Sequence, residues 1–267
     1  MQYIDCKKYA QEILDEVKAI PNKKKLIILT VGDDPASQSY VKGKIKDCEY
    51  CGVPYEHIKC APDMLGWHIY ASNVAANVGG IIVQLPLPDG MDEAYYTNMI
   101  DSKKDVDGFK VNSPFKPCTP EGIMYLLEKE LGDLTGMNAT VIGRGKLVGE
   151  PIAKMLLDAN CTVTVAHSKT KHLSDHLELA NIVISAVGKP NFLNLSSASS
   201  YPDVVIDVGV NRNDNGKLVG DCYNFSEEYF EHMKVTPVPG GIGLMTRAML
   251  MKHMGEVSKN GFGGSIK

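Results

Sequence analysis

The chain has 267 residues, of which 44% are hydrophobic and 22% are charged, and its formal net charge at pH 7 is −4. This length is enough for two modest domains with separate cores, and the composition is ordinary for a globular protein. A small negative charge gives no broad positive field, which argues against nucleic acid as a partner. The longest apolar runs, residues 26–31 and 79–87, are far too short to cross a bilayer, so we expect no membrane partner.

The N-terminal segment MQYIDCKKYAQEIL is amphipathic, with neither the apolar core of a signal peptide nor an Arg-rich transit segment, so we expect a cytoplasmic protein. Seven cysteines without framework spacing predict free thiols in a reducing compartment. Cys48 and Cys51 have the spacing of half a zinc site, but no second pair follows. We predict that both pack inside a helix and that the protein binds no metal.

In chain order, apolar residues at helical spacing predict a first helix over residues 6–20, which Pro21 ends. A strand over 26–31 leads through the turn GDDP to a helix that Ser37 caps and Gly52 ends. We then expect a strand at 55–59, a helix at 65–77, a strand at 80–84 and a helix at 92–99. This alternation predicts a parallel sheet with helices on its faces.

A second alternating unit follows Pro117. We expect helices at 120–131, 150–158 and 173–178, and strands at 139–142, 162–166, 182–187 and 204–208. This pattern is typical of a Rossmann-type domain, and the whole chain is predicted to be α/β. The Ser-rich stretch 195–200 indicates a loop, the last helix covers about 245–257, and the terminal GFGGSIK is expected to fray.

A glycine-rich loop joins the first strand and helix of this second unit. Gly143, Arg144, Gly145 and Gly149 have the spacing G-x-G-x-x-x-G, one residue longer than the usual dinucleotide fingerprint. The loop is either a tight packing turn or a site where backbone N–H groups and a helix N-terminus bind a pyrophosphate.

The next strand decides between the two nicotinamide cofactors. It ends in AHSKT, without the carboxylate that accepts hydrogen bonds from the ribose 2′-hydroxyl in an NAD site. Arg144 and Lys169 can balance a 2′-phosphate, and Ser168 can donate to it. The sequence therefore favours NADP over NAD.

Polar residues also gather in the first unit. Tyr40 and Lys44 are four residues apart, which on a helix puts both on one face, where they form either a substrate site or an ordinary solvated surface. Gln84 ends a buried strand, at the edge where α/β proteins bind ligands, although it can equally bond a loop. Asp105 and Asp107, before Gly108, are on their own most typical of a turn.

Four segments carry a family resemblance: VGDDPASQSYVKGKIK, GGIIVQLPLP, KDVDGF and TPVPGGIGLMT. With PCTPEG and VIGRGKLVGEP, they resemble the bifunctional methylenetetrahydrofolate dehydrogenase/methenyltetrahydrofolate cyclohydrolase family in order and approximate spacing, from about residue 26 to 253. The resemblance implies a folate domain, residues 1–118 completed by a C-terminal helix at 245–267, and an NADP-binding Rossmann domain at 119–244. It also implies a cytoplasmic homodimer that oxidises 5,10-methylenetetrahydrofolate with NADP and hydrolyses the product to 10-formyltetrahydrofolate, a one-carbon donor for purine biosynthesis.

The resemblance also assigns roles to residues. Tyr40 would stack on the p-aminobenzoate of folate, Asp107 would accept hydrogen bonds from the pterin edge, and Gln84 would aim the amine of Lys44, the proton relay. Arg144 and Ser168 would contact the 2′-phosphate, and the backbone near Val210 would meet the nicotinamide. The other implied substrate positions are Val83, Leu85, Pro239, Gly240 and Gly241.

This chain departs from the family at several positions, so a dehydrogenase with weak or lost cyclohydrolase is an alternative to the bifunctional enzyme. Gly145 stands where the family usually has Ser, Leu244 where it has Pro, and Arg247 where it has an aliphatic residue; the segment 109–116 is shorter than usual. Arg247 either attracts the glutamate tail of folate or faces solvent. The remaining histidines lack metal-ligand spacing and are expected at surface or boundary positions: His57, His68, His172, His176, His232 and His253.

Two other functions compete with this interpretation. A shikimate-type NADP dehydrogenase would explain Lys44, Asp107 and the basic turn at Ser168, but not Tyr40 beside Lys44 or the segment PVPGG. A non-catalytic nucleotide-binding protein should lack either a proton-transfer group or a second-substrate pocket. Reduction of NADP only with methylenetetrahydrofolate would separate the three.

Overall fold

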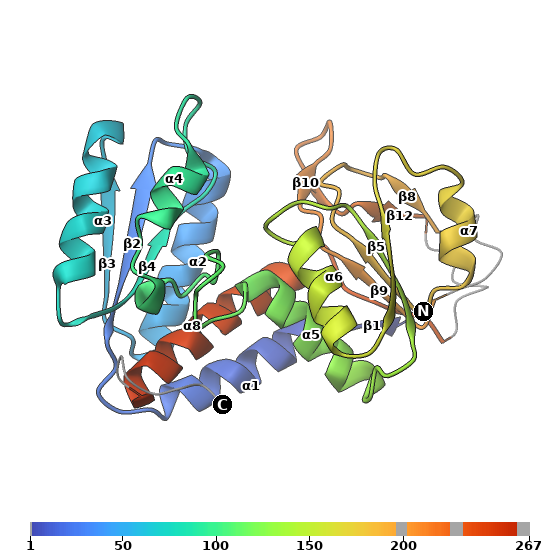
Figure 1. Cartoon of the computed structure of the whole chain (residues 1–267), viewed down its shortest axis with the longest axis horizontal. Helices are drawn as coiled ribbons and strands as arrows, with labels where there is room; N and C mark the ends of the chain where they lie inside the picture. Colours follow the sequence, from blue (N-terminus) through green and yellow to red (C-terminus); the bar gives the residue numbers. More distant parts are fainter. Residues whose placement is uncertain (1, 196–201, 225–231, 261–267) are drawn as a thin grey trace. The chain divides into compact units, whose positions relative to one another are not determined.

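The computed structural model describes residues 2–195, 202–224 and 232–260 (Figure 1). These residues form two compact units, which we name by their sheets. The three-stranded unit holds Gln11–Cys118 and the last helix from Arg247 onward, and the six-stranded unit holds the chain up to Ala10 and Thr119–Thr246. No helix among the described residues is long and apolar enough to cross a membrane.

The three-stranded unit has a parallel sheet in the order β3-β2-β4. Its strands are β2 (Lys25–Val31), β3 (Tyr55–Cys60) and β4 (Val78–Val83), and its helices are α2 (Pro35–Cys51), α3 (Leu65–Val74) and α4 (Glu93–Asn98). Leu65 and Ile69 of α3 pack with alternate residues of the strands, such as Leu29 and Ile81, in one apolar core. Because β4 is buried along its whole length, its sequence is an unbroken apolar run.

Two details of this unit differ from the sequence prediction. Asp34, not Ser37, is the N-cap of α2: its carboxylate accepts the Ser37 backbone N–H at 2.7 Å, and Pro35 occupies the first turn. Ser37 supplies the capped N–H, because Pro35 starts the helix earlier than predicted. Helix α3 ends at Val74 rather than residue 77, since Ala75 is already extended and leads into β4. Gly52 ends α2 in the left-handed conformation, as predicted.

The six-stranded unit has a parallel sheet in the order β1-β13-β9-β7-β5-β6. Its strands are β1 (Gln2–Tyr3), β5 (Asn138–Ile142), β6 (Thr162–Ala166), β7 (Ile182–Ser185), β9 (Val204–Asp207) and β13 (Lys234–Val235). The helices are α5 (Cys118–Leu131), α6 (Gly149–Asp158) and α7 (Leu173–Glu178), and α1 (Cys6–Lys18) and α8 (Ile242–Asn260) each have residues in both units. Short two-stranded pairs complete it: β8 (Leu193–Asn194) with β12 (Cys222–Tyr223), and β10 (Asn211–Arg212) with β11 (Leu218–Val219).

The parallel α/β architecture predicted from the sequence is confirmed in both units. The N-terminal residues lie with the six-stranded sheet, because Gln2 and Tyr3 pair with Lys234 and Val235. As folding domains, the boundaries at residues 118 and 245 stay a prediction. Most of the loop predicted at 195–200 and the terminal segment GFGGSIK lie outside the described residues.

Candidate functional site

Helix α2 presents Tyr40 and Lys44 one turn apart. Lys44 is only 6% exposed, and among the residues that the structure describes its ammonium has no hydrogen bond or ion pair. Lysine is almost never buried without a partner. Burial raises the pKa of the half-buried Tyr40 phenol, an effect that the charge of Arg247 partly opposes. The predicted pair is therefore enclosed by the fold and is not a solvated helix surface.

Gln84 lies at the carboxyl end of β4, between the buried Val83 and the half-buried Leu85. Its backbone N–H continues the sheet by donating to Leu29 O at 2.9 Å, and its side-chain amide donates to Leu85 O at 2.7 Å. Its Oε1 atom is buried and accepts no hydrogen bond from the described residues. The expected hydrogen bond to Lys44 is not formed, yet Oε1 is an acceptor that a donor such as an ammonium or a ligand would satisfy.

The segment KDVDGF is fixed to the sheet by its first residues. The Lys104 ammonium donates to the carbonyls of Ser72, Asn73 and Ala75 at 2.7–3.0 Å, and Asp105 bridges to Ile81 of β4. Asp105 accepts the Lys110 N–H at 2.8 Å, as turn chemistry predicts, and burial raises the pKa of its carboxyl. Asp107 follows this anchored turn with a side chain that is almost entirely buried.

Cys118 is a buried thiol on which the charges of both Lys44 and Asp107 act. Its thiol is fully buried, and burial raises its pKa. The charges of three groups act on this one thiol: His253, Asp107 and Lys44. The structure therefore brings the predicted proton relay and the predicted pterin acceptor within electrostatic range of the same buried atom.

The expected surface or boundary position of His253 is wrong. It is 1% exposed, not at a surface or boundary, because α8 directs it into the three-stranded unit. Its Nδ1 is 2.7 Å from Val106 O and 3.6 Å from the Cys118 sulfur, and its ring stacks on Phe115. Since Cys118 N–H also donates to Asp107 O, the backbone carbonyls on both sides of the Asp107 Cα atom are held by hydrogen bonds.

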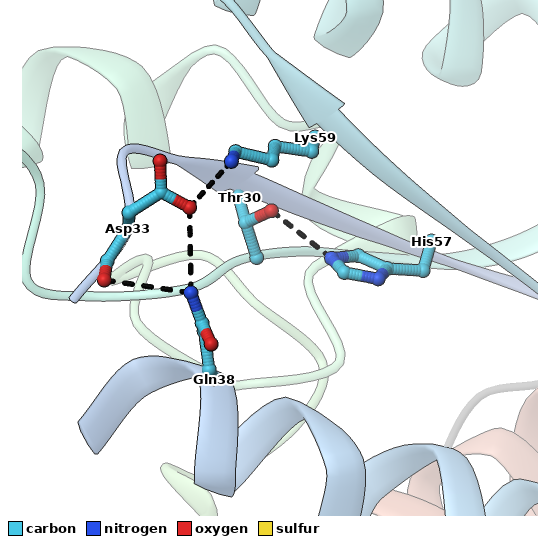
Figure 2. A network of polar contacts seen from close by, with 5 residues as sticks. All are labelled: Thr30, Asp33, Gln38, His57 and Lys59. Carbon is cyan, nitrogen blue, oxygen red and sulfur yellow. Dashed lines mark hydrogen bonds and ion pairs between the residues drawn. The ribbon is translucent and has the colours of Figure 1, made fainter. Parts of the chain in front are cut away.

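A cavity of about 360 Å³ lies beside a different face of α2. Gln38, Val41, Lys42 and Ile45 line it from the helix, and Gln84 is the one predicted site residue among its lining. Figure 2 shows the polar contacts at its wall: Asp33 pairs with Lys59 and accepts from Gln38, while Thr30 contacts the His57 ring at 3.0 Å. Tyr40 and Lys44 do not line this cavity, so it meets the predicted site only at Gln84.

The glycine loop of the six-stranded unit has the geometry of an anion site. A Cβ on Gly149 would be 2.3 Å from Gly143 O, so only glycine fits there. Val148 makes no side-chain cap, Glu150 N–H donates to Gly145 O, and residue 151 is proline, so of the first three residues of α6 only Gly149 has an N–H without a partner in the described part of the chain. Unpaired N–H groups at a helix N-terminus favour an anion such as a pyrophosphate.

Cationic side chains lie at the next strand end. Arg144 follows β5 and Ser168 and Lys169 follow β6, and the last residues of these two strands, Ile142 and Ala166, are partners in the sheet. All three side chains are exposed, and His167 N–H donates to Thr170 to close the turn. The strand order places β5 between β6 and β7, which is the switch point where such sheets bind ligands. The residues present fit a nicotinamide dinucleotide with a 2′-phosphate.

The other predicted positions of this unit lie at the ends of its strands. Val210 follows β9 and is 50% exposed. Pro239 and Gly240 are exposed in the turn before α8, and Gly241 is buried there.

Two buried carboxylates were missed by the sequence reasoning. Asp221 is fully buried and accepts the backbone N–H groups of residues 187–189, which follow β7. Asp207 accepts the N–H groups of Gly209, Asp221 and Cys222, and burial raises its pKa. Together they hold the loops after β7 and β9, including the one that carries Val210. The only sequence signal is that Asp207 ends a buried apolar strand, and no comparable pattern precedes Asp221.

Among the described residues, no group of three or more His, Cys, Asp or Glu side chains is placed to hold a metal ion. Cys48 and Cys51 are buried in α2: one contacts the Met251 sulfur, and the other donates to Leu14 O. Both cysteine side chains therefore pack against neighbouring residues in the interior.

Comparison with known proteins gives two family matches that together span most of the chain. Residues 4–107 match the tetrahydrofolate dehydrogenase/cyclohydrolase catalytic domain, and residues 117–261 match the NAD(P)-binding domain of the same name. A relative from Campylobacter hominis, bifunctional protein FolD, is 43% identical over 97% of this chain and 98% of its own length.

Solved structures agree. The bifunctional enzyme FolD, methylenetetrahydrofolate dehydrogenase/cyclohydrolase, from Campylobacter jejuni is 39% identical with a TM-score of 0.89, covering 97% of this chain and 99% of that one. A Trypanosoma brucei methylenetetrahydrofolate dehydrogenase-cyclohydrolase complexed with NADP and an inhibitor is 28% identical with a TM-score of 0.85, covering 94% and 95%.

Proposed function

Because this chain belongs to the tetrahydrofolate dehydrogenase/cyclohydrolase family, we propose that it oxidises 5,10-methylenetetrahydrofolate with NADP and hydrolyses the methenyl product to 10-formyltetrahydrofolate. The observation that carries this function is the match of both family domains, in order, along one chain. A shikimate-type dehydrogenase is not favoured, since it would not account for the match of residues 4–107 to the catalytic domain.

Folate binding is assigned to the three-stranded unit. Tyr40 stacks on the p-aminobenzoate ring, an aromatic contact that its half-buried position supports. Asp107 accepts from the amino and N–H groups of the pterin, and a charged acceptor against two donors gives orientation and discrimination. The anchoring of the residues on both sides of Asp107 supports this role. Val83 and Leu85 complete the substrate contacts of this unit, and the other proposed substrate positions, Pro239, Gly240 and Gly241, belong to the six-stranded unit.

Lys44 moves the proton in the hydrolysis. The methenyl group is already cationic, so water attack needs a nearby proton acceptor more than it needs activation of the electrophile. Lys44 is buried and has no fixed partner among the described residues, so its side chain is free to contact the reacting water. Gln84, with a free buried Oε1, aims the amine.

NADP is the cofactor, and when bound it accepts the hydride from the methylene carbon. The loop at Gly143, Gly145 and Gly149 and the uncapped N-terminus of α6 hold the pyrophosphate. Arg144, Ser168 and Lys169 hold the 2′-phosphate, and the backbone at Val210 meets the nicotinamide side. Gly145 cannot supply a hydroxyl, so the 2′-phosphate relies on the cations and Ser168.

The protein acts as a cytoplasmic homodimer, and its product supplies formyl groups to purine biosynthesis. Strand β6 is an edge of the six-stranded sheet, and apolar side chains on and near it are exposed: Leu157 by 57% and Val165 by 40%. An exposed edge strand with apolar neighbours supports self-association through this unit. Sedimentation of the wild type and of Val165→Lys tests this, since the charge should produce monomers.

The activity is tested by following NADPH and methenyltetrahydrofolate absorption together in one reaction. We expect NADP reduction that requires methylenetetrahydrofolate, followed by disappearance of the methenyl product. Accumulation of the methenyl product without its disappearance would show a dehydrogenase that lacks the second step. No reduction at all would overturn the proposed function.

A further inference from the structure

Arg247 reaches from α8 to α2 inside the three-stranded unit. Its Nε is 3.0 Å from Oδ2 of Asp47, and the two side chains are 21% and 9% exposed. The guanidinium covers Gly43: a Cβ built there would be 1.7 Å from Nη1 and 2.8 Å from Cζ. The absence of a side chain at position 43 therefore makes room for the guanidinium. Arg247 is not a residue that simply faces solvent.

This places a cation on the helix face that carries the proposed folate residues. Tyr40, Gly43, Lys44 and Asp47 are spaced i, i+3, i+4 and i+7, which is one face of α2. The guanidinium over Gly43 thus lies between the positions of Tyr40 and Asp47. Its charge also lowers the pKa of the Tyr40 phenol, against the larger effect of burial, which shows that the two groups are close.

The ion pair with Asp47 engages only the Nε atom of the guanidinium. The Nε atom lacks the alignment of a hydrogen bond, and Nη1 and Nη2 donate to no group in the described part of the chain. An arginine whose only purpose was to neutralise Asp47 would be expected to meet its carboxylate with two parallel N–H groups. The free fork of N–H groups is the geometry that binds another carboxylate.

We propose that Arg247 binds a carboxylate of the glutamate tail of the folate substrate. This rests on the proposed function, which places p-aminobenzoate against Tyr40. Glutamate is joined to that ring by one amide bond, so a cation beside Tyr40 lies where the anionic tail begins. The ion pair with Asp47 fixes the position of Arg247, and the missing side chain at Gly43 leaves room for the guanidinium.

The test measures the KM of Arg247 variants for two substrates, 5,10-methylenetetrahydrofolate and 5,10-methylenetetrahydropteroate. The second substrate lacks the glutamate. Arg247→Met should raise KM for the glutamate-bearing substrate about tenfold, the effect of losing one charge-assisted hydrogen bond. KM for the pteroate substrate and for NADP should stay unchanged, and Arg247→Lys should restore part of the loss. A KM that rises equally for both substrates, or for neither, overturns the proposal.

Two further variants keep the test decisive. Asp47→Asn with Arg247→Met removes both members of the pair, so no buried carboxylate is left uncompensated if the single variant folds poorly. Gly43→Ala displaces the guanidinium without removing any charge and should raise the KM ratio of the two substrates in the same direction. Failure of the proposed function would appear differently, as a wild type that reduces NADP with neither substrate.

Discussion

Substitution of Lys44 should remove the cyclohydrolase activity and leave the dehydrogenase activity. It is buried, and within the described chain no group pairs with it, so its removal leaves no partner unsatisfied. We expect Lys44→Met to lower the cyclohydrolase rate by about 10²–10⁴-fold, the usual contribution of a proton-transfer group. Dehydrogenase activity should remain measurable, because hydride transfer needs no proton from the protein.

The matched control is Lys46→Met, on the same helix but exposed, which should change neither rate. Both rates are read from one reaction as NADPH formation and methenyl consumption. If Lys44→Met keeps both activities equally, Lys44 has no part in the mechanism.

His253 should act on Asp107 through the backbone. Its Nδ1–H donates to Val106 O, and its ring stacks on Phe115. His253→Leu leaves that carbonyl with only the weak thiol donor of Cys118, so we expect a loss of about 1–3 kcal/mol in stability and a higher KM for folate. His253→Asn keeps an N–H donor and should recover most of the KM. A variant pair that loses stability without any difference in folate KM would show a purely structural role.

At the scale of the element, the N-terminus of α6 is the most constrained part of the cofactor site. Gly149→Ala would bring a methyl group to 2.3 Å from Gly143 O, which is backbone and cannot move aside cheaply. We expect at least a tenfold higher KM for NADP and a loss of about 1–3 kcal/mol in stability from overpacking. Calorimetry and NADP titration measure both. Gly145→Ala, where nothing lies within 4 Å, should leave the thermal midpoint unchanged, and an equal shift in the two variants would contradict this account.

The sequence predicts best those elements whose burial is reflected in a continuous run of apolar residues. Strands β2, β4 and β5 are buried along most of their length, and β6 and α7 have the predicted bounds. Strands β1 and β13 have two residues each, too few to show any periodicity, and they exist only because they pair with each other and with β9.

The candidate site likewise contains residues that the local sequence predicts and residues that it does not predict. Tyr40 and Lys44 follow from helical spacing, and the glycine loop follows from its position between a strand and a helix. The burial of His253 and the anchoring by Asp207 and Asp221 depend on elements far away in sequence, so no local pattern predicts them. The position of Arg247 over Gly43 is of the same kind, because it joins residues about two hundred positions apart.

For the molecule as a whole, the seven cysteines give a test of the complete fold. All are free and buried, and burial is the main cause that raises the pKa of each. Because the thiolate is the reactive form, native protein near pH 8 should react with Ellman's reagent at far below the rate of a free thiol. Denaturant should release seven reactive thiols. One fast thiol in the native protein would mean that part of the fold opens easily.

The same thiols set the alkaline limit of stability. Folding raises the pKa from 9.0 to about 12 in Cys6 and Cys48 and to about 11 in Cys51. Above pH 9 the unfolded chain therefore loses thiol protons that the native protein keeps, so the free energy of unfolding falls as pH rises from about 9 to about 12. Urea unfolding at a series of pH values measures this. Cys48→Ala removes one such group and should make the decline shallower, and an unchanged slope would show that its burial does not contribute.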